Sequence, residues 1–343
     1  MDETKSLNVQ DQGGRGTCPR ARPPLRRTGP PELPGIALSV CQGKIERTGL
    51  ERIPKSLLDL LSVPGQSGVI LDAIREGADV NVSSGGGFTP LMLAALLNDD
   101  PVIVRALIEA GADVNAETRE GMTALTWALQ AETQNPDDGD LRGFLERDRR
   151  RVEAAMLLVE SGADVNVACC SPRRMRWTPL LFATLAPDRN AEVIGAMLAA
   201  GAGANARTTE DVTPLFHAAA FGRSSDVVRD LIRAGADVNA RGGQEGRRGW
   251  TPLLYALTGP CKSRPIVEEL LGNGASVDVV VGNGQTPLHF AAVIGDTPAF
   301  VHALLEAGAD ADALDGDGNS ALDNAMSQNH KNVVRRLLRA KTG

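Results

Sequence analysis

The segment GQTPLHFAA at residues 284–292, with LLEAGADADA at residues 304–313, decides the fold. Thr286 can cap the unpaired N–H groups at a helix start, and Pro287 suits the first helical position. Leucine and small residues follow, so we expect a short helix that packs closely against its neighbours. A second helix with paired leucines ends at Gly308, where a left-handed C-cap favours glycine. The segment therefore predicts two short helices and a polar turn.

Both markers recur along the chain with a base period of 34 residues. The Gly-Ala marker lies at Gly77, Gly111, Gly162, Gly201, Gly235, Gly274 and Gly308. The Thr-Pro-Leu marker, or a variant of it, lies at Thr89, Thr123, Thr178, Thr213, Thr251, Thr286 and Ser320. One such unit cannot bury its own apolar face, but stacked units can. The sequence therefore predicts an all-α solenoid.

This pattern resembles the ankyrin repeat. Six complete units match over about residues 87–313, and degenerate units precede and follow them. The expected units lie near residues 53–86, 87–120, 121–175, 176–210, 211–248, 249–283, 284–317 and 318–343. The last unit has Ser320 in place of threonine and Lys341 in place of glycine. Its Arg335, Arg336 and Arg339 predict a terminal cap that faces solvent.

Composition excludes several functional classes. The 343 residues carry a formal net charge of −7, which argues against general nucleic-acid binding. We find no apolar run of about 18 residues, so we expect no membrane span. Five scattered cysteines read as reduced thiols and favour a cytoplasmic protein. Residues 1–52 are basic and rich in proline, and we expect a disordered tail that is either a docking peptide or a simple extension.

Catalytic and metal-binding patterns are missing from the sequence. The four histidines form no His-Glu-x-x-His motif, and no Cys-x-x-Cys motif occurs, so we expect no enzyme, metal or cofactor. The acidic residues 310–319 are similar in composition to a calcium-binding loop. However, Ser320 and Met326 stand where an EF-hand needs glycine and glutamate, so we interpret the segment as another finger loop. The resemblance gives His289 a structural hydrogen-bonding role.

Three insertions interrupt the repeat, and insertions in a solenoid often mark a binding face. Residues 131–150 lengthen the link between two helices and predict either a partner-specific lobe or a solvated helix extension. By the resemblance to ankyrin repeats, we expect residues 167–177 and 240–250 to form lengthened finger loops. Their arginines predict contact with an acidic partner segment, or else simply keep the finger tips soluble. The candidate arginines are Arg173, Arg174, Arg176, Arg247 and Arg248.

The residue before each threonine points to the concave face in the resembling family. Four such residues are large and apolar, and we expect them to anchor a partner: Phe88, Met122, Trp177 and Trp250. Near the ends of the first helices, Leu97, Phe221 and Ile294 extend the same expected surface. The alternative is that the indoles fold back onto adjacent fingers as packing.

These features predict a monomeric, non-catalytic adaptor that binds another protein, one with an acidic segment, through its concave face and fingers. The alternative function is an inhibitor, regulator or host-directed effector that uses the same surface to occlude a partner enzyme. Neither nucleic acid nor a membrane is an expected partner.

Overall fold

A computed structural model describes residues 57–63, 65–97, 100–130, 141–170, 176–243, 246–295 and 297–341, without the side chains of 141–147 and 341. All of them belong to the part of the chain from Thr48 to Gly343. Their regular elements are helices, and four isolated β-bridges lie in the loops between them. The predicted all-α class is therefore confirmed. None of the described helices combines the length and apolar character needed to cross a membrane.

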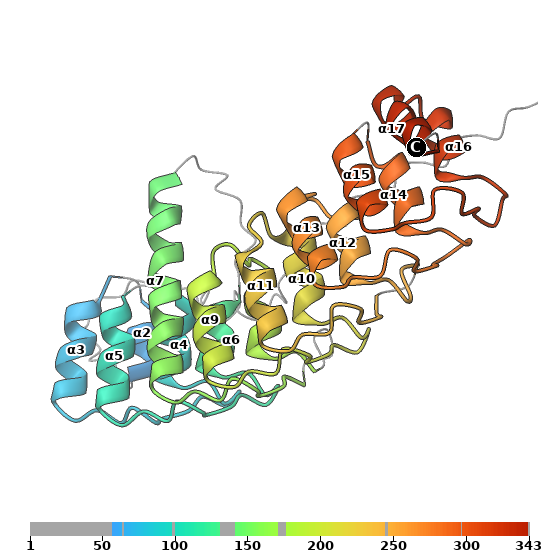
Figure 1. Cartoon of the computed structure of the whole chain (residues 1–343). Coiled ribbons are helices and arrows are strands. Elements are labelled where there is room, and N and C mark those ends of the chain that lie inside the picture. Colours follow the sequence, from blue (N-terminus) through green and yellow to red (C-terminus); the bar gives the residue numbers. More distant parts are fainter. Residues whose placement is uncertain are drawn as a thin grey trace, which may run out of the picture. The chain divides into compact units, whose positions relative to one another are not determined.

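The helices come in pairs, as the repeat predicts. The first helices of the pairs are α2 (Leu57–Leu61), α4 (Pro90–Leu97), α6 (Ala124–Leu129), α8 (Pro179–Ala183), α10 (Pro214–Phe221), α12 (Pro252–Thr258), α14 (Pro287–Val293) and α16 (Ala321–Ser327). The second helices are α3 (Ser67–Arg75), α5 (Pro101–Glu109), α7 (Leu141–Glu160), α9 (Ala191–Ala199), α11 (Asp226–Arg233), α13 (Arg264–Gly272), α15 (Pro298–Glu306) and α17 (Lys331–Lys341). Each helix packs against its counterpart in the next pair (Figure 1).

The two sequence markers set the helix boundaries. Prolines occupy the first turn of α4, α8, α10, α12 and α14, directly after the threonines. The seven marker glycines, from Gly77 to Gly308, all have φ between 83° and 91°. At Gly111 the chain closes a Schellman motif, in which Gly111 N–H donates to Ile108 and Ala112 N–H donates to Leu107. A side chain with a Cβ is strained at this φ, which explains the recurring glycine.

An asparagine ladder connects six consecutive units. In each step an asparagine donates through Nδ2 to the carbonyl of the next marker glycine, and its Oδ1 accepts the N–H two residues beyond that glycine. For Asn166 these distances are 3.1 Å to Gly201 and 2.9 Å from Gly203. The five asparagines are Asn81, Asn115, Asn166, Asn205 and Asn239. Asp278 occupies the next ladder position, and the ladder ends there.

The finger loops are also joined laterally by backbone hydrogen bonds. Arg119 N–H donates to Gly86 at 3.4 Å, and Cys170 N–H donates to Glu120 at 2.7 Å. We number the fingers by the marker threonines that follow them, so that residues 167–177 are the third finger and residues 240–250 the fifth. Gly243 N–H donates to Glu210 at 2.9 Å, which brings the lengthened fifth finger against the fourth. A Cβ on the adjacent Gly242 would overlap the carbonyl of Asp211, so this close approach requires glycine.

The second half of the 131–150 insertion forms the start of α7, which extends beyond the neighbouring helices in Figure 1. Residues 131–140 lie outside the described residues. Arg151, a residue of α7, is buried and ties this helix to its neighbours. Its guanidinium donates to the carbonyl of Ala128 at 3.1 Å, to Asp148 at 3.1 Å and to Asn190 at 3.0 Å. One buried cation thus connects the two helices of its own unit with the next unit.

Replacing Asn166 by alanine should remove both of its inter-unit hydrogen bonds. We expect the free energy of unfolding to fall by about 1 to 2 kcal/mol, because two solvent-exposed bonds are lost. Urea unfolding followed by far-UV circular dichroism measures the change. The control is Glu192→Ala at an exposed position of the next unit, which should change stability by less than about 0.5 kcal/mol. Equal losses of unfolding free energy in both variants would show that the asparagine ladder does not stabilise the contact between units.

Candidate functional site

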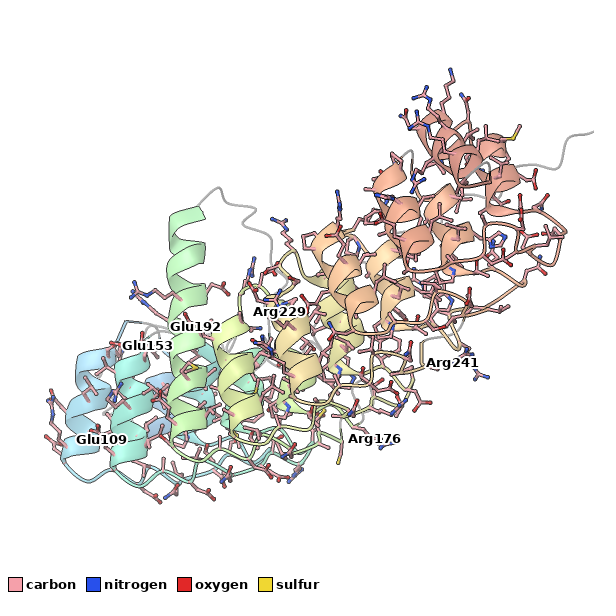
Figure 2. The ribbon with its side chains drawn as sticks, in the orientation of Figure 1. Glu109, Glu153, Arg176, Glu192, Arg229 and Arg241 are labelled. Carbon is pink, nitrogen blue, oxygen red and sulfur yellow. The ribbon has the colours of Figure 1, made fainter. Side chains whose placement is uncertain are left out.

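The two lengthened fingers form short hairpins, each closed by a tryptophan. Cys169 pairs with Trp177, and Gly242 pairs with Trp250, as isolated antiparallel bridges. Arg173 and Arg174 lie outside the described residues. Arg176 is exposed, with φ of 65°, and directs its side chain away from the helices at the finger edge (Figure 2). The tryptophans therefore sit at the base of the fingers, against the first helices.

The residues four positions after the marker threonines form an aromatic row across the first helices. The residues that directly precede these threonines pack against the row. The row consists of Trp127, Phe182, His217, Tyr255 and Phe290. The ring of Phe88 lies 5.2 Å from that of Trp127, measured between centroids. Trp177 lies 5.3 Å from both Phe182 and His217, which belong to its own and the next unit. We name this surface the inner face.

Sequence reasoning missed the aromatic row. We compared the residues that precede each threonine. We did not compare the residues four positions after each threonine, although these positions recur in every unit as well. Within a helix that starts at the residue after threonine, this later position lies one turn inside the helix. Large side chains there can reach back to the finger base. Aligning the units column by column would have found the row.

The structure gives the four expected anchors different environments. Met122 and Trp250 are buried, with 5% and 8% of their surface exposed. Trp250 packs between Tyr255 and Phe290, at 5.6 Å and 5.1 Å, so it contributes to packing, as the alternative interpretation stated. Phe88 and Trp177 are half-buried and retain some accessible surface. The inner face therefore offers a contact surface at Phe88 and Trp177 rather than at all four positions.

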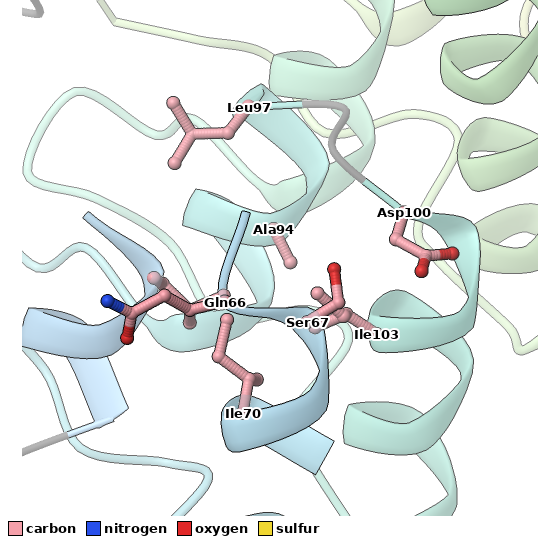
Figure 3. A pocket seen from close by; sticks show the side chains of 8 residues that line it. Gln66, Ser67, Ile70, Ala94, Leu97, Asp100 and Ile103 are labelled. Carbon is pink, nitrogen blue, oxygen red and sulfur yellow. The ribbon is translucent and has the colours of Figure 1, made fainter. Parts of the chain in front are cut away.

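The three expected extensions of this surface also differ. Phe221 is 40% exposed and its ring lies 6.2 Å from that of His217. Ile294 is half-buried against the core. Leu97 lines a pocket between α3, α4 and α5, together with Ile70 and Asp100 (Figure 3). That pocket has room for about 10 Å³, which is about one water molecule.

Arg247 covers the buried indole of the fifth finger. Its guanidinium carbon lies 4.8 Å from the Trp250 ring and 5.5 Å from the Tyr255 ring, which is cation–π distance. Burial raises the pKa of the Tyr255 hydroxyl, and Arg247 partly offsets this effect. Arg248, the next residue, is exposed. Both residues of this predicted pair are exposed, and Arg247 also lies over the two rings.

Exposed charged side chains lie on both the fingers and the second helices. Arg176 and Arg241 project from the finger edge, whereas Glu109, Glu153 and Glu192 project from the second helices α5, α7 and α9 (Figure 2). All five side chains are exposed. Both sides also carry exposed residues of the opposite sign, among them Glu210 on the finger before Thr213 and Arg233 on α11.

The acidic segment at residues 310–319 forms a finger, as expected. The carboxylate of Asp315 accepts the N–H groups of Asp317 at 3.0 Å and Asn319 at 2.9 Å, which lowers its pKa. His289 spans to this finger: it accepts the Thr286 N–H at Nδ1 and donates from Nε2 to the carbonyl of Asn319. Its predicted structural role is confirmed. Among the described residues no three acidic, histidine or cysteine side chains are grouped to hold a metal ion.

Comparisons with known proteins agree with this architecture. The family model described as "Ankyrin repeats (3 copies)" matches residues 63–137, 147–242, 184–279 and 260–343. The human "Ankyrin repeat and SAM domain-containing protein 3" is 38% identical over 93 residues, which are 26% of this chain and 14% of that protein. The chain thus matches only a small part of that relative. The crystal structure of the human ASB11 ankyrin repeat domain is similar with a TM-score of 0.55 and 27% identity, covering 74% of this chain and 98% of that one.

The burial of Trp250 gives a stability prediction. Trp250→Ala should lower the free energy of unfolding by about 3 kcal/mol, because it removes a packed indole and leaves a cavity. Phe221→Ala should cost less than about 1 kcal/mol, since that ring is substantially exposed. Urea unfolding monitored by circular dichroism compares the two variants. Equal costs would mean that the inner face does not divide into packed and accessible aromatic residues.

Proposed function

The chain belongs to the ankyrin repeat family, and we propose that it is a non-catalytic adaptor that binds a partner protein through its inner face and central fingers. Ankyrin repeats are general protein–protein interaction modules. The observation that carries the proposal is the central patch, formed by Trp177, His217 and Phe221 beside the exposed Arg176. Aromatic side chains and arginine are the residues most enriched among interface hot spots.

The central patch combines accessible aromatic surface with a rigid support. Trp177 is held by the hairpin bridge to Cys169 and by its contacts with two rings. His217 makes a 3.3 Å contact from Nδ1 to the Thr184 hydroxyl, which orients the ring. Because these side chains are already ordered, binding costs little conformational entropy. The patch therefore suits a partner that inserts an apolar side chain.

The exposed finger arginines favour an acidic partner segment. Arg176, Arg241 and Arg248 lie on the third and fifth fingers, in a chain whose net charge is −7. Exposed ion pairs contribute little free energy each, so the aromatic contacts would supply most of the affinity. The arginines would instead raise the association rate and select the partner.

A triple charge reversal tests this proposal. Arg176→Glu, Arg241→Glu and Arg248→Glu together should strongly reduce capture of the partner from native lysate, because the acidic segment is then repelled. Capture on the full chain followed by mass spectrometry identifies the proteins retained. Any effect on the captured protein's activity separates an inhibitor from a passive adaptor.

The matched control reverses three exposed arginines on the second helices: Arg105→Glu, Arg149→Glu and Arg233→Glu. It changes the net charge equally, so the same partner should still be captured. All six positions are exposed, and both variants should melt like the parent chain. The proposal fails if the finger variant retains the partner, or if both variants lose it equally.

A further inference from the structure

The last unit exposes positions that are buried in every complete unit. Six residues after the threonine, the side chain is between 0% and 1% exposed wherever another unit follows. These positions are Ala95, Leu129, Thr184, Ala219, Leu257 and Ala292. The equivalent residue of the last unit is Met326, which is large, apolar and 60% exposed. A solvent-facing cap would place a polar residue here.

The second helix of the last unit repeats this feature. Seven residues before the marker glycine, Val301 of the preceding unit is fully buried, and its equivalent Val334 is only half-buried. Leu338, four residues later on α17, is 48% exposed. On α16, Leu322 is half-buried, whereas its equivalent Leu288 is 1% exposed. The apolar pattern of stacking therefore continues through the last unit.

These four residues form one surface, which we name the end face. Leu322 and Met326 are four residues apart on α16, and Val334 and Leu338 are four residues apart on α17, so each pair lies on one side of its helix. The two helices pack against each other. In the preceding unit the positions equivalent to Leu322, Met326 and Val334 are buried, and the position equivalent to Leu338 is half-buried. The end face therefore has the arrangement that receives a helix everywhere else in the stack.

The rim of the end face is basic. Lys331, Arg335 and Arg339 are exposed on α17. Arg336 turns back to the preceding unit, where it donates to His302 Nδ1 at 2.7 Å. The one acid of α16, Asp323, caps its own helix through the N–H and hydroxyl of Ser320. The expected charged cap is thus limited to a rim around an apolar centre.

We propose that the end face binds an amphipathic helix of a partner protein, with acidic residues beside its apolar stripe. The apolar centre and its similarity to the helix-receiving face of each earlier unit indicate a helix. The basic rim selects the acidic flanks. A second copy of this chain fits less well, because two end faces in a symmetric dimer would bring like charges together. This site is separate from the inner face and does not depend on its function.

Two synthetic 18-residue helices provide the probes. Both carry the same leucine–alanine stripe, and one has glutamate flanks while the other has lysine flanks. Fluorescence anisotropy of each labelled helix measures its affinity for the full chain. We expect the glutamate helix to bind at least about tenfold more tightly. This is a stringent result, because the net charge of −7 attracts the lysine helix at long range.

Variants with uncharged glutamine replacements test where on the chain the glutamate helix binds. Met326→Gln with Leu338→Gln should weaken the glutamate helix by about tenfold or more, because apolar contact is lost. The matched control is Val69→Gln with Val102→Gln, at positions that are 53% and 52% exposed on α3 and α5, and it should bind unchanged. Lys331→Gln with Arg335→Gln should remove the preference for glutamate flanks. All these positions are exposed, so circular dichroism should show equal melting.

Three results would overturn the proposal. The first is that neither helix binds, or that the lysine helix binds as tightly as the glutamate helix. The second is that the Met326 and Leu338 variant binds as well as the parent chain. The third is a dimer, seen by sedimentation velocity, that dissociates when Met326 and Leu338 are replaced, since a second copy would then be the occupant.

Discussion

The asparagine ladder is the interaction on which the arrangement of the units depends. Helix packing alone is tolerant of sliding, because apolar contact has no preferred direction. Each asparagine instead donates to one backbone carbonyl and accepts from one backbone N–H of the next unit, which fixes the distance and the register together. The ladder joins the units from Asn81 to Ser276 and so holds the third, fourth and fifth fingers side by side. The central patch exists because those fingers have a fixed spacing.

Most of the fold follows from local sequence. Thr-Pro at a helix start and glycine at a helix end form hydrogen bonds or turns with residues close by in the sequence. The helix boundaries that they set can therefore be predicted without knowing the tertiary structure. The structure confirms the paired helices and all seven glycine turns. By contrast, Arg151 appears in the sequence as one of several arginines in a charged insertion. Its burial depends on Ala128 in the other helix of its unit and on Asn190 in the next unit, and no local pattern indicates it.

The site was harder to predict, for a physical reason. Whether a large apolar residue beside a finger is an anchor or a packed side chain depends on what the next unit places against it. Trp250 meets Phe290 and is buried, whereas Trp177 meets His217 and stays partly accessible. Both tryptophans directly precede Thr-Pro-Leu-Leu, so their neighbours in the sequence do not distinguish them. They differ in the residue that the following unit places against them. The end face could be anticipated in the same way, because Met326 departs from the polar residue that a cap requires.

The central claim is that a partner lies against Phe221 on the inner face. Site-specific photo-crosslinking tests it directly, with a benzophenone amino acid placed at position 221 or, as the control, at exposed position 102 on α5. After irradiation in native lysate, mass spectrometry should find one protein attached at position 221 and not at position 102. Attachment of that protein at position 102 alone would contradict the account and assign binding to the second helices.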